Sequence, residues 1–397
     1  MVRRATLVAQ AGTFPVGAAQ IPTIPAINAT SVLVPRVAAL APLGKETLAA
    51  SSRDIYEGFH YGGVGTPTTA ALAQAVARLE GGRFAALTPS GQSAIATILS
   101  ALLRPGDHLL VVDTVTYTTR WYLDRILKRG GIDVTYYAPE RRFDISTMVQ
   151  PTTKAIFLES PGSFTFEVQD IRAVAQVARN CGVVSILDNT WAASCFLDPF
   201  AGGVDVSVLS LTKYHAGIAG VSLGAIVTDR LDLYEAVREE AALAGLYVSP
   251  DVCAQASLAM STLEARLGHQ EASTQIVLDG LNRHPKLRAL LHPSRPDHMG
   301  HAFWCRDFAG GNSLVSLAFR EGERDAVEAI VDRFRLIRIG YGWGGAVSLV
   351  TIFEANAGRT VSRAPVSGTC LRLYIGLEDP ADVLADLQQA LDGGGAS

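Results

Sequence analysis

The sequence contains few cysteines, and their scarcity excludes two ways of stabilising a small domain. Only 5 of the 397 residues are cysteine, an odd number, and no two of them form a CxxC pair. Neither a disulfide framework nor a zinc ribbon is therefore expected, no metal site is predicted, and a reducing cytoplasm fits this usage best. The five are Cys181, Cys195, Cys253, Cys305 and Cys370.

Long apolar runs and an excess of one charge are also missing. No stretch approaches the roughly 18 uncharged apolar residues that a membrane span requires. Gln10, Gly12 and Pro15 interrupt the opening residues, which we interpret as an N-terminal arm rather than a signal peptide. Lys and Arg total 34 against 38 Asp and Glu, and they are scattered along the chain. Neither a membrane nor a nucleic acid is expected as a partner.

Familiar nucleotide-binding and hydrolase motifs are absent. The chain has no GxxxxGK[ST], no GxGxxG after a strand, no GxSxG and no HExxH. The sequence therefore does not indicate a P-loop nucleotide hydrolase, a dinucleotide-binding fold, a serine hydrolase or a zinc protease.

From about Thr66 the pattern settles into alternating helices and short apolar strands, which is typical of a largely parallel sheet covered on both faces. Thr66 and Pro67 predict a helix start, and Gly81 predicts its end. A Gly/Ser turn then opens a second helix at TPSGQ. Buried strands are expected at HLLVVD, KAIFLES, VVSILD, VDVSVLS and VSLGAIV, and amphipathic helices at TTRWYLDRILKRGG and VQDIRAVAQVARNCG.

We expect three regions, and the fold class is α/β. Residues 1–59 form the arm, and residues 60–255 form a large domain with a mostly parallel sheet. Residues 256–397 form a smaller α+β domain, with strand-like runs at SLVSLAF and CLRLYIGL and a closing helix at PADVLADLQQAL.

Two residues that follow neighbouring strands carry the strongest chemical signal. Asp188 ends VVSILD, and Lys213 follows VDVSVLS. In an open parallel sheet, ligands bind at the carboxyl ends of the strands, so both side chains should face one cleft. Alone, the aspartate is more typical of a turn and the lysine of a solvated surface. Together they match pyridoxal 5′-phosphate (PLP), which needs an amine for a Schiff base and a carboxylate beside its ring nitrogen.

Residues near this pair could hold the cofactor phosphate. Ser210 and Thr212 flank the lysine segment with hydroxyl groups. Gly91 and Gln92 start the second helix and offer backbone N–H groups and the positive end of the helix dipole.

The motifs FHYGGVGTPT, LEGG, FLESPGS, ILDNTWAAS, LTKYHAG, GHAFWCRDF, YGWGG and LRLYIGLED resemble those of the Cys/Met-metabolism PLP enzymes of fold type I. The resemblance extends from about Thr6 to the last helix and is greatest to the bacterial cystathionine β-lyase branch. It implies the fold type I architecture, Lys213 as the Schiff-base lysine and Asp188 as the partner of the ring nitrogen.

The resemblance also implies roles for residues elsewhere in the chain. Arg372 would clamp the α-carboxylate of the substrate, and Tyr341 and Trp343 would line the substrate side, although on composition alone these residues also suit an ion pair and core packing. Tyr61 would reach the cofactor phosphate of a neighbouring subunit, which implies a homotetramer built as a dimer of dimers.

Three positions depart from the family pattern, and each carries a smaller residue. Gly63 replaces a phosphate-binding arginine, and Gly342 replaces a serine that supports the carboxylate clamp. Thr116 replaces a tyrosine that stacks on the cofactor, and Tyr117, one place later, is the candidate for its proton-transfer role. These changes leave the substrate open.

The function that we predict is β-elimination from a sulfur amino acid, in the manner of cystathionine β-lyase. A γ-elimination or γ-replacement enzyme that acts on a bulkier amino acid is the alternative, because it would use the same residues. Two further possibilities are an aminotransferase of the same fold and a PLP-holding protein with little turnover.

Overall fold

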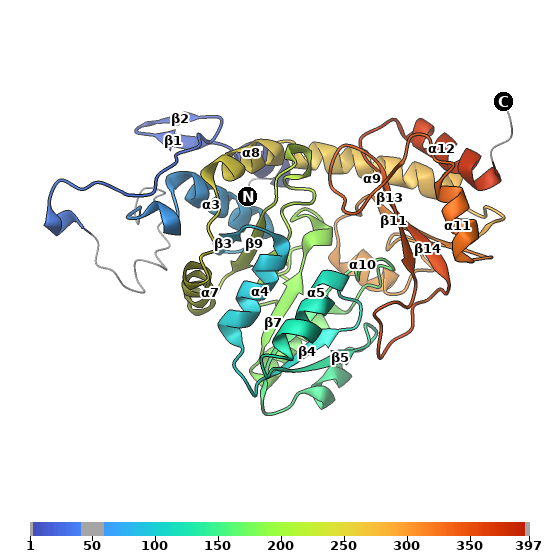
Figure 1. Cartoon of the computed structure of the whole chain (residues 1–397), viewed down its shortest axis with the longest axis horizontal. Coiled ribbons are helices and arrows are strands. Elements are labelled where there is room, and N and C mark those ends of the chain that lie inside the picture. The colour runs from blue at the N-terminus through green and yellow to red at the C-terminus, as the bar shows by residue number, and fades with distance from the viewer. Residues whose placement is uncertain (1–2, 41–58, 394–397) are drawn as a thin grey trace.

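The computed structural model describes residues 3–40 and 59–393. Two β-sheets organise the described part of the chain. As Figure 1 shows, one lies within the helices of the first two thirds of the chain, and the other lies near the C-terminus. The long helix α9 (Leu263–Gly280) runs from one sheet towards the other.

The larger sheet has seven strands in the order β3-β9-β8-β7-β6-β4-β5. All neighbouring pairs are parallel except the two that involve β9. The predicted α/β class with a mostly parallel sheet is therefore confirmed. The strands are β3 (Phe84–Thr88), β4 (His108–Val112), β5 (Asp133–Tyr137), β6 (Thr153–Glu159), β7 (Val184–Asp188), β8 (Val206–Leu209) and β9 (Gly224–Thr228).

The first helices of this unit begin and end where local side chains dictate. In α3 (Pro67–Glu80), the Thr66 hydroxyl accepts a hydrogen bond from the Thr69 N–H, and Gly81 ends the helix with a φ of 90°. In α4 (Gly91–Leu102), Ser90 plays the capping role through the Ser93 N–H. Because these caps satisfy N–H groups that have no partner in the helix, they set its start independently of distant contacts.

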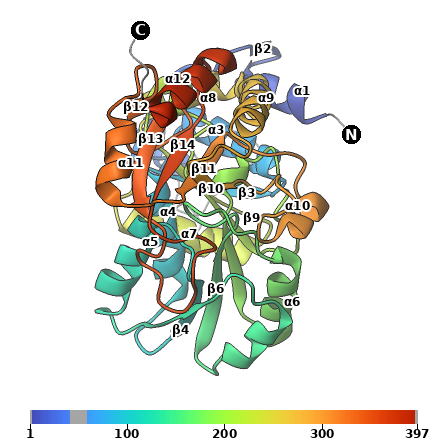
Figure 2. The same ribbon diagram turned by 90° about the vertical axis from the view of Figure 1, so that its right-hand side faces the viewer.

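Helices cover both faces of the sheet, as its near-continuous apolar strands require. Figure 2 shows α6 (Ile171–Cys181) on one side of the strands and α4 and α5 (Tyr117–Tyr122) on the other, and α7 (Leu231–Leu243) contacts α4. The predicted helix after Tyr117 continues from α5 into a π-helical turn, Leu123–Leu127. Short 3-10 turns lie at Val37–Ala39, Gly62–Val64, Phe143–Met148, Thr190–Ala192 and Gly217–Ala219.

The second sheet has five strands in the order β10-β11-β14-β13-β12, antiparallel except for the β12–β13 pair. It contains the predicted strands β11 (Leu314–Phe319) and β14 (Thr369–Tyr374), and it adds three that we did not predict. The other elements here are β10 (Leu287–Leu291), β12 (Arg338–Ile339), β13 (Leu349–Glu354), α8 (Pro250–Met260), α10 (His301–Asp307), α11 (Arg324–Val331) and α12 (Pro380–Asp392). The predicted boundary between residues 255 and 256 falls within α8 and stays a prediction.

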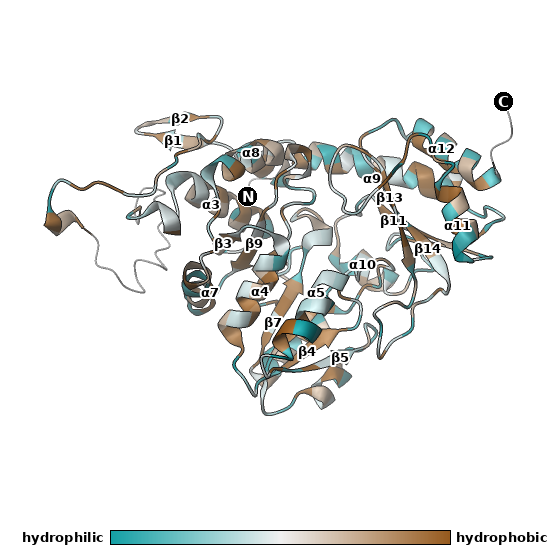
Figure 3. Ribbon diagram, viewed as in Figure 1, coloured by the Kyte–Doolittle hydropathy of each residue, from teal (hydrophilic) through white to brown (hydrophobic). Residues whose placement is uncertain are grey.

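Each sheet has its own apolar core. One core cluster surrounds the strands of the larger sheet, and a second joins Leu371 and Leu373 of β14 to Val383 and Leu387 of α12. In Figure 3, central strands of the larger sheet such as β7 and β4 are coloured as hydrophobic, whereas the outer helices carry hydrophilic stretches. No helix in residues 3–40 and 59–393 is both long and apolar enough to cross a membrane.

The described part of the N-terminal region lies against the larger unit. It contains α1 (Arg4–Ala9) and a hairpin of β1 (Phe14–Val16) and β2 (Ala19–Ile21). The side chain of Phe14 is buried with Ile24 and Ala71, which fixes the hairpin against α3. Of the predicted arm, residues 1–2 and 41–58 lie outside the described residues.

Candidate active site

A cavity of about 1130 Å³ lies at the carboxyl ends of the larger sheet's strands and reaches the smaller sheet. Asp188 is the last residue of β7, and Lys213 lies just beyond β8. Arg372 enters from β14 of the other sheet, and all three line the same cavity. The structure thus brings together the three residues on which the predicted chemistry depends.

Thr190 hydrogen-bonds both to Asp188 and to Ser210, which starts the segment that leads to Lys213. Its N–H donates to Asp188 Oδ1 at 3.0 Å, and its hydroxyl oxygen accepts the Ser210 N–H at 2.8 Å. Burial raises the pKa of Asp188, while the Thr190 hydrogen bonds and the Lys213 charge oppose that rise. A cationic ring nitrogen beside this carboxylate would supply the favourable charge that burial removes.

The surroundings of Lys213 lower the pKa of its amine and so shift it towards the neutral form. Its side chain makes no hydrogen bond or ion pair with any residue that the structure describes, and its Nζ lies 5.5 Å from the ring centroid of Trp343. Burial, followed by the positive charge of Arg372, lowers the pKa of Lys213, while Asp188 raises it. A lowered pKa favours the unprotonated amine that attacks a carbonyl or takes a proton.

The start of α4 faces the lysine segment and forms a polar end of the cavity. Gly91, Gln92 and Ser210 all line it. Both side-chain amide atoms of Gln92 are buried without a hydrogen-bond partner among the described residues. The hydroxyl of Thr212 is already engaged, because it donates to the Leu223 carbonyl at 3.1 Å and accepts the Leu223 N–H at 3.0 Å.

Glycine is required at position 91 for the helix to approach the lysine segment. A Cβ atom there would lie 2.5 Å from Ser210 Cβ and 2.9 Å from Ser210 Cα, far inside van der Waals contact. This closeness brings the helix N-terminus and the Ser210 hydroxyl to the same place, where both can donate hydrogen bonds to one anion.

The guanidinium of Arg372 is buried, with only part of its hydrogen-bonding capacity in use. Its Nη2 donates to the Gly342 carbonyl at 3.0 Å and to the Thr351 hydroxyl at 3.3 Å, whereas its Nε has no partner among the described residues. Burial lowers the pKa of Arg372 to about 10, so the group stays charged at neutral pH. A buried guanidinium with unused donors is suited to an anionic group of a ligand.

Gly342 supports Arg372 through its backbone rather than through a side chain. The serine that the family pattern places there is therefore not needed to orient the arginine. Trp343 packs on Tyr214 with ring centroids 5.1 Å apart and lines the cavity, whereas Tyr341 stands at its rim with 91% of its surface exposed.

Thr116 and Tyr117 occupy different parts of the cavity wall. The Thr116 N–H donates to Glu159 Oε2 at 2.7 Å. The Tyr117 ring packs against Trp121 and Phe164, at centroid distances of 6.2 and 5.3 Å. Burial raises the pKa of Tyr117, so its hydroxyl remains protonated near neutral pH.

Tyr61 is not among the residues that line the cavity of this single chain. Its side chain is 55% exposed, and its backbone forms a bridge with Ser31. A Cβ atom at Gly63 would lie 2.6 Å from Tyr61 Cε1, so a larger residue at 63 requires this exposed ring to move.

Sequence reasoning missed two residues of the site. Glu159 pairs with Asp188 across strands β6 and β7, and its pKa is raised well above the usual value by burial and by the Asp188 charge. Its position as the last residue of strand β6 is the same signal that identified Asp188 at the end of β7, and it was available from the predicted strand KAIFLES. Phe164, which lies with its ring 5.2 Å from the Arg372 guanidinium carbon, has no such signal.

The residues present fit pyridoxal phosphate. The unpartnered amide of Gln92 and the Ser210 hydroxyl lie at the α4 N-terminus, where a phosphate is stabilised by the helix dipole. Among the described residues the Lys213 amine has no ionic partner, and the Asp188 carboxylate, whose pKa is raised by burial, is suited to a ring cation. The Gln92 amide has no hydrogen-bond partner among the described residues, and the cofactor would provide one.

Comparisons with known proteins agree with this geometry. A family model described as Cys/Met metabolism PLP-dependent enzyme matches residues 22–392. The chain is 35% identical to cystathionine beta-lyase MetC of Escherichia coli strain K12, over 82% of this chain and 84% of that protein. It is also 32% identical to an L-alanine/L-glutamate racemase of Wolbachia pipientis, over 89% of each.

The fold is shared with a solved structure of the same group. The crystal structure of cystathionine gamma-lyase CalE6 from Micromonospora echinospora superimposes with a TM-score of 0.86 at 30% identity, covering 99% of this chain and 100% of that one. The relatives on this scaffold therefore include proteins named as a β-lyase, a γ-lyase and a racemase.

Proposed function

Because the chain belongs to the Cys/Met metabolism PLP-dependent enzyme family, we propose that it cleaves the C–S bond of a sulfur amino acid by β-elimination. Pyridoxal 5′-phosphate is its cofactor, as the family description states. The observation that carries the proposal is the meeting of Lys213, Asp188 and Arg372 in one cavity. The identity to the Escherichia coli β-lyase favours a lyase of the β type.

Each of these residues has a role that follows from its environment. When bound, pyridoxal phosphate supplies an electron-accepting ring next to the α-carbon of the substrate. Arg372 binds the α-carboxylate with the donors that the protein leaves unused, and Asp188 keeps the ring nitrogen protonated. Lys213, whose lowered pKa favours the free amine, removes the proton from the α-carbon.

The departing thiolate needs a proton, and we assign this role to Tyr117. Its hydroxyl is protonated near neutral pH, and its side chain lines the cavity. Its ring contacts Phe164, which in turn covers Arg372, so Tyr117 belongs to the same wall as the carboxylate site.

The alternative is γ-elimination or γ-replacement on a bulkier amino acid. The small side chain of Thr116 at the cavity wall favours this alternative, since it leaves space that a tyrosine would fill. The γ reactions need a second proton removal, from the β-carbon, and use the same lysine.

Product analysis with L-cystathionine separates these reactions. β-Elimination releases pyruvate, ammonia and homocysteine, whereas γ-elimination releases 2-oxobutyrate, ammonia and cysteine. Mass spectrometry of the products over a panel of β- and γ-substituted amino acids identifies the preferred substrate. Conversion of the cofactor to pyridoxamine phosphate would instead indicate an aminotransferase, and the absence of any keto acid would contradict the proposal.

Restoring the tyrosine tests whether the site has diverged from cystathionine cleavage. Thr116→Tyr is the first variant to examine, because Gly63→Arg also displaces the Tyr61 ring; the double variant follows. A large gain in β-cleavage of cystathionine supports divergence towards a bulkier substrate. Brisk cleavage by the unmodified enzyme, with no gain in either variant, supports an ordinary β-lyase.

We also propose that the enzyme is a cytoplasmic homotetramer, a dimer of dimers. Tyr61 is exposed and does not line the cavity of its own chain, which supports a role at the cofactor phosphate of a neighbouring subunit. The five free cysteines agree with a reducing compartment. Sedimentation that showed a fully active monomer would contradict the assembly.

A further inference from the structure

The segment that links β6 to α6, residues 160–169, reaches across to the smaller sheet and covers Arg372; we name it the crossing segment. The Phe164 ring lies with its centroid 5.2 Å from the guanidinium carbon of Arg372. Phe164 has a φ of 66° and Phe166 a φ of 60°, in the left-handed region that residues with bulky side chains rarely adopt. Such a conformation persists only where the surrounding structure holds it in place.

Hydrogen bonds from the five-stranded sheet and its connections hold this conformation. The Ser316 hydroxyl donates to the Phe164 carbonyl at 2.6 Å, and His298 Nε2 donates to the Thr165 carbonyl at 3.0 Å. Ser316 pairs with Arg372 across β11 and β14. The sheet that presents the arginine therefore also fixes the backbone of the residue that covers it.

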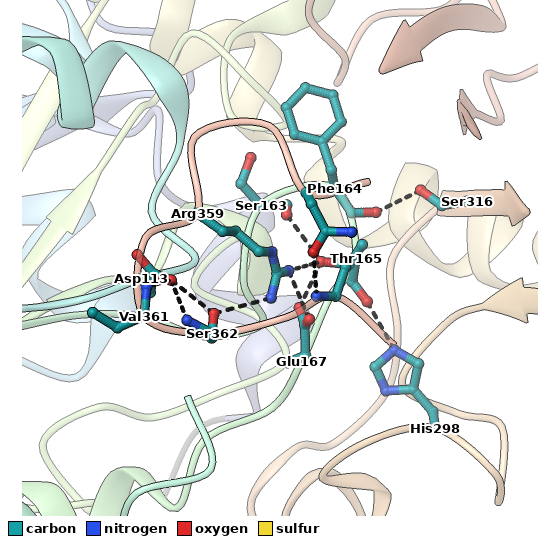
Figure 4. Close-up of polar contacts among 12 residues, drawn as sticks. Asp113, Ser163, Phe164, Thr165, Glu167, His298, Ser316, Arg359, Val361 and Ser362 are labelled. Atoms are coloured by element: carbon teal, nitrogen blue, oxygen red, sulfur yellow. Dashed lines mark hydrogen bonds and ion pairs between the residues drawn. The ribbon is translucent and has the colours of Figure 1, made fainter. Parts of the chain in front are cut away.

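A buried ion pair fastens the crossing segment from the other side. The loop between β13 and β14, residues 355–368, is here named the anchor loop, and it carries Arg359. Arg359 Nη2 donates to the Thr165 hydroxyl oxygen and, at 2.7 Å, to Glu167 Oε1, while the Thr165 hydroxyl donates to Glu167 Oε2 at 2.6 Å. The Arg359 and Glu167 side chains are 6% and 0% exposed. Figure 4 shows the three side chains meeting beneath Phe164.

The contact with the Phe164 ring affects how the Arg372 guanidinium presents its hydrogen-bond donors. An aromatic ring attracts a guanidinium cation and leaves the N–H groups of that cation free to bind an anion. Thr351 and Gly342 accept hydrogen bonds from Nη2, so the guanidinium is held at one nitrogen and at the Phe164 ring. Its Nε has no partner in the part of the chain that the structure describes. The orientation of the free donors thus depends on Phe164.

We propose that Phe164 is a positioning residue for the substrate α-carboxylate, that it acts through Arg372, and that the Arg359–Glu167 pair holds it in place. The inference rests on the carboxylate role of Arg372 in the proposed function. It does not depend on whether the bond that breaks lies at the β- or the γ-carbon.

Binding of L-alanine to the holoenzyme, followed by the change in visible absorption of the bound cofactor, is the first test. L-Alaninamide is the matched probe because it lacks the carboxylate. Phe164→Leu should weaken L-alanine binding about tenfold, the scale of a desolvated cation–π contact, and leave L-alaninamide binding nearly unchanged. Phe164→Tyr keeps an aromatic ring and should therefore retain the preference of the unmodified enzyme for L-alanine over L-alaninamide. Phe143→Leu, at a phenylalanine that is 59% exposed, is the control.

A double-variant cycle asks whether Phe164 acts through Arg372. In an Arg372→Lys background, Phe164→Leu should have little further effect on L-alanine binding, because the group that it orients is gone. Full additivity of the two changes, or an equal loss for acid and amide, would overturn the proposal. If the Leu variant does not fold, loss of the acid-over-amide preference in Phe164→Tyr overturns it as well.

The ion pair is tested with substitutions in the anchor loop. Arg359→Gln should raise the KM for the amino-acid substrate several-fold with a smaller change in kcat, and Arg359→Lys should recover part of the loss. Arg363→Gln, at an exposed arginine of the same loop, is the control. An unchanged KM for Arg359→Gln in a folded enzyme contradicts the role of the pair. If the unmodified enzyme binds L-alanine but cleaves no C–S bond, the proposed reaction fails while this inference stands.

Discussion

Replacing Asp113 with asparagine should destabilise the protein strongly, because this carboxylate joins the anchor loop to the larger sheet. Asp113 follows β4 with its side chain fully buried, and Arg120 donates to Oδ1 at 2.7 Å. The backbone N–H groups of Thr360, Val361 and Ser362 donate to the same carboxylate, at 2.8 to 3.1 Å. Figure 4 shows part of this contact, where Val361 and Ser362 turn their N–H groups towards Asp113.

The magnitude follows from the charge of the carboxylate. Burial raises the pKa of Asp113, but hydrogen bonds from Val361 and Ser362 outweigh it and lower the pKa from 3.8 to about 2. At about 1.4 kcal/mol per pKa unit, the ionised form contributes about 2–3 kcal/mol to the free energy of unfolding. Asparagine also leaves Arg120 buried without its anion and turns an amide donor towards other donors, so a loss of about 3–5 kcal/mol is expected at neutral pH.

Urea unfolding across a pH series measures both effects. A lowered folded-state pKa gives stability that is present above pH 3.8 and is lost as the pH falls towards 2. The difference between the native protein and Asp113→Asn should be constant from about pH 8 to pH 5 and shrink below about pH 4. Asp229→Asn, at an exposed position, is the control. Equal stability at neutral pH, or a difference that does not shrink in acid, would refute the reasoning.

Three predictions concern the cofactor. Lys213→Ala should abolish the visible absorption of covalently held cofactor, and a borohydride-stable adduct at another lysine would show that the assignment is wrong. Asp188→Ala should slow proton removal from the α-carbon by about two to three orders of magnitude, as loss of a preorganised charge does; near-normal turnover in deuterium-exchange assays would exclude its role. Gly91→Ala places a Cβ 2.5 Å from Ser210 Cβ and should weaken cofactor binding at least about tenfold by displacing the phosphate donors of α4. Gly268→Ala, a helical position with no atom within 4 Å of the added Cβ, is the matched control, and equal cofactor affinity in both variants would contradict the steric argument.

Local signals in the sequence predict much of the larger sheet. Thr66, Pro67 and Gly81 set the bounds of α3 through contacts within a few residues, so no tertiary knowledge is needed. The strand pattern also predicts that Asp188 and Lys213 meet, since parallel strands end at one edge. Strands β10 and β13 of the smaller sheet were not predicted. The sequence of β10, LRALL, consists of residues that favour helix, whereas the apolar and β-branched residues of β13, LVTIFE, were an available strand signal.

The rest of the site depends on contacts between distant segments. The Gly342 carbonyl accepts a hydrogen bond from Arg372, and because this is a backbone group, the residue type at position 342 does not predict the contact. The left-handed conformation of Phe164 results from partners such as Ser316 and His298, which lie far away in the chain. When the role of a residue depends on its backbone or on distant partners rather than on its side-chain type, only the three-dimensional structure reveals that role.

The anchor loop also sets the order in which the protein matures during synthesis. The residues that hold the cofactor, from Gly91 to Lys213, leave the ribosome well before Arg359 and Arg372. Until the anchor loop is synthesised, Asp113 lacks the N–H groups of Thr360, Val361 and Ser362, and the crossing segment lacks the Arg359–Glu167 ion pair. A nascent chain should therefore become able to capture the cofactor before it can select an amino acid, so that recognition of substrate marks the completion of folding.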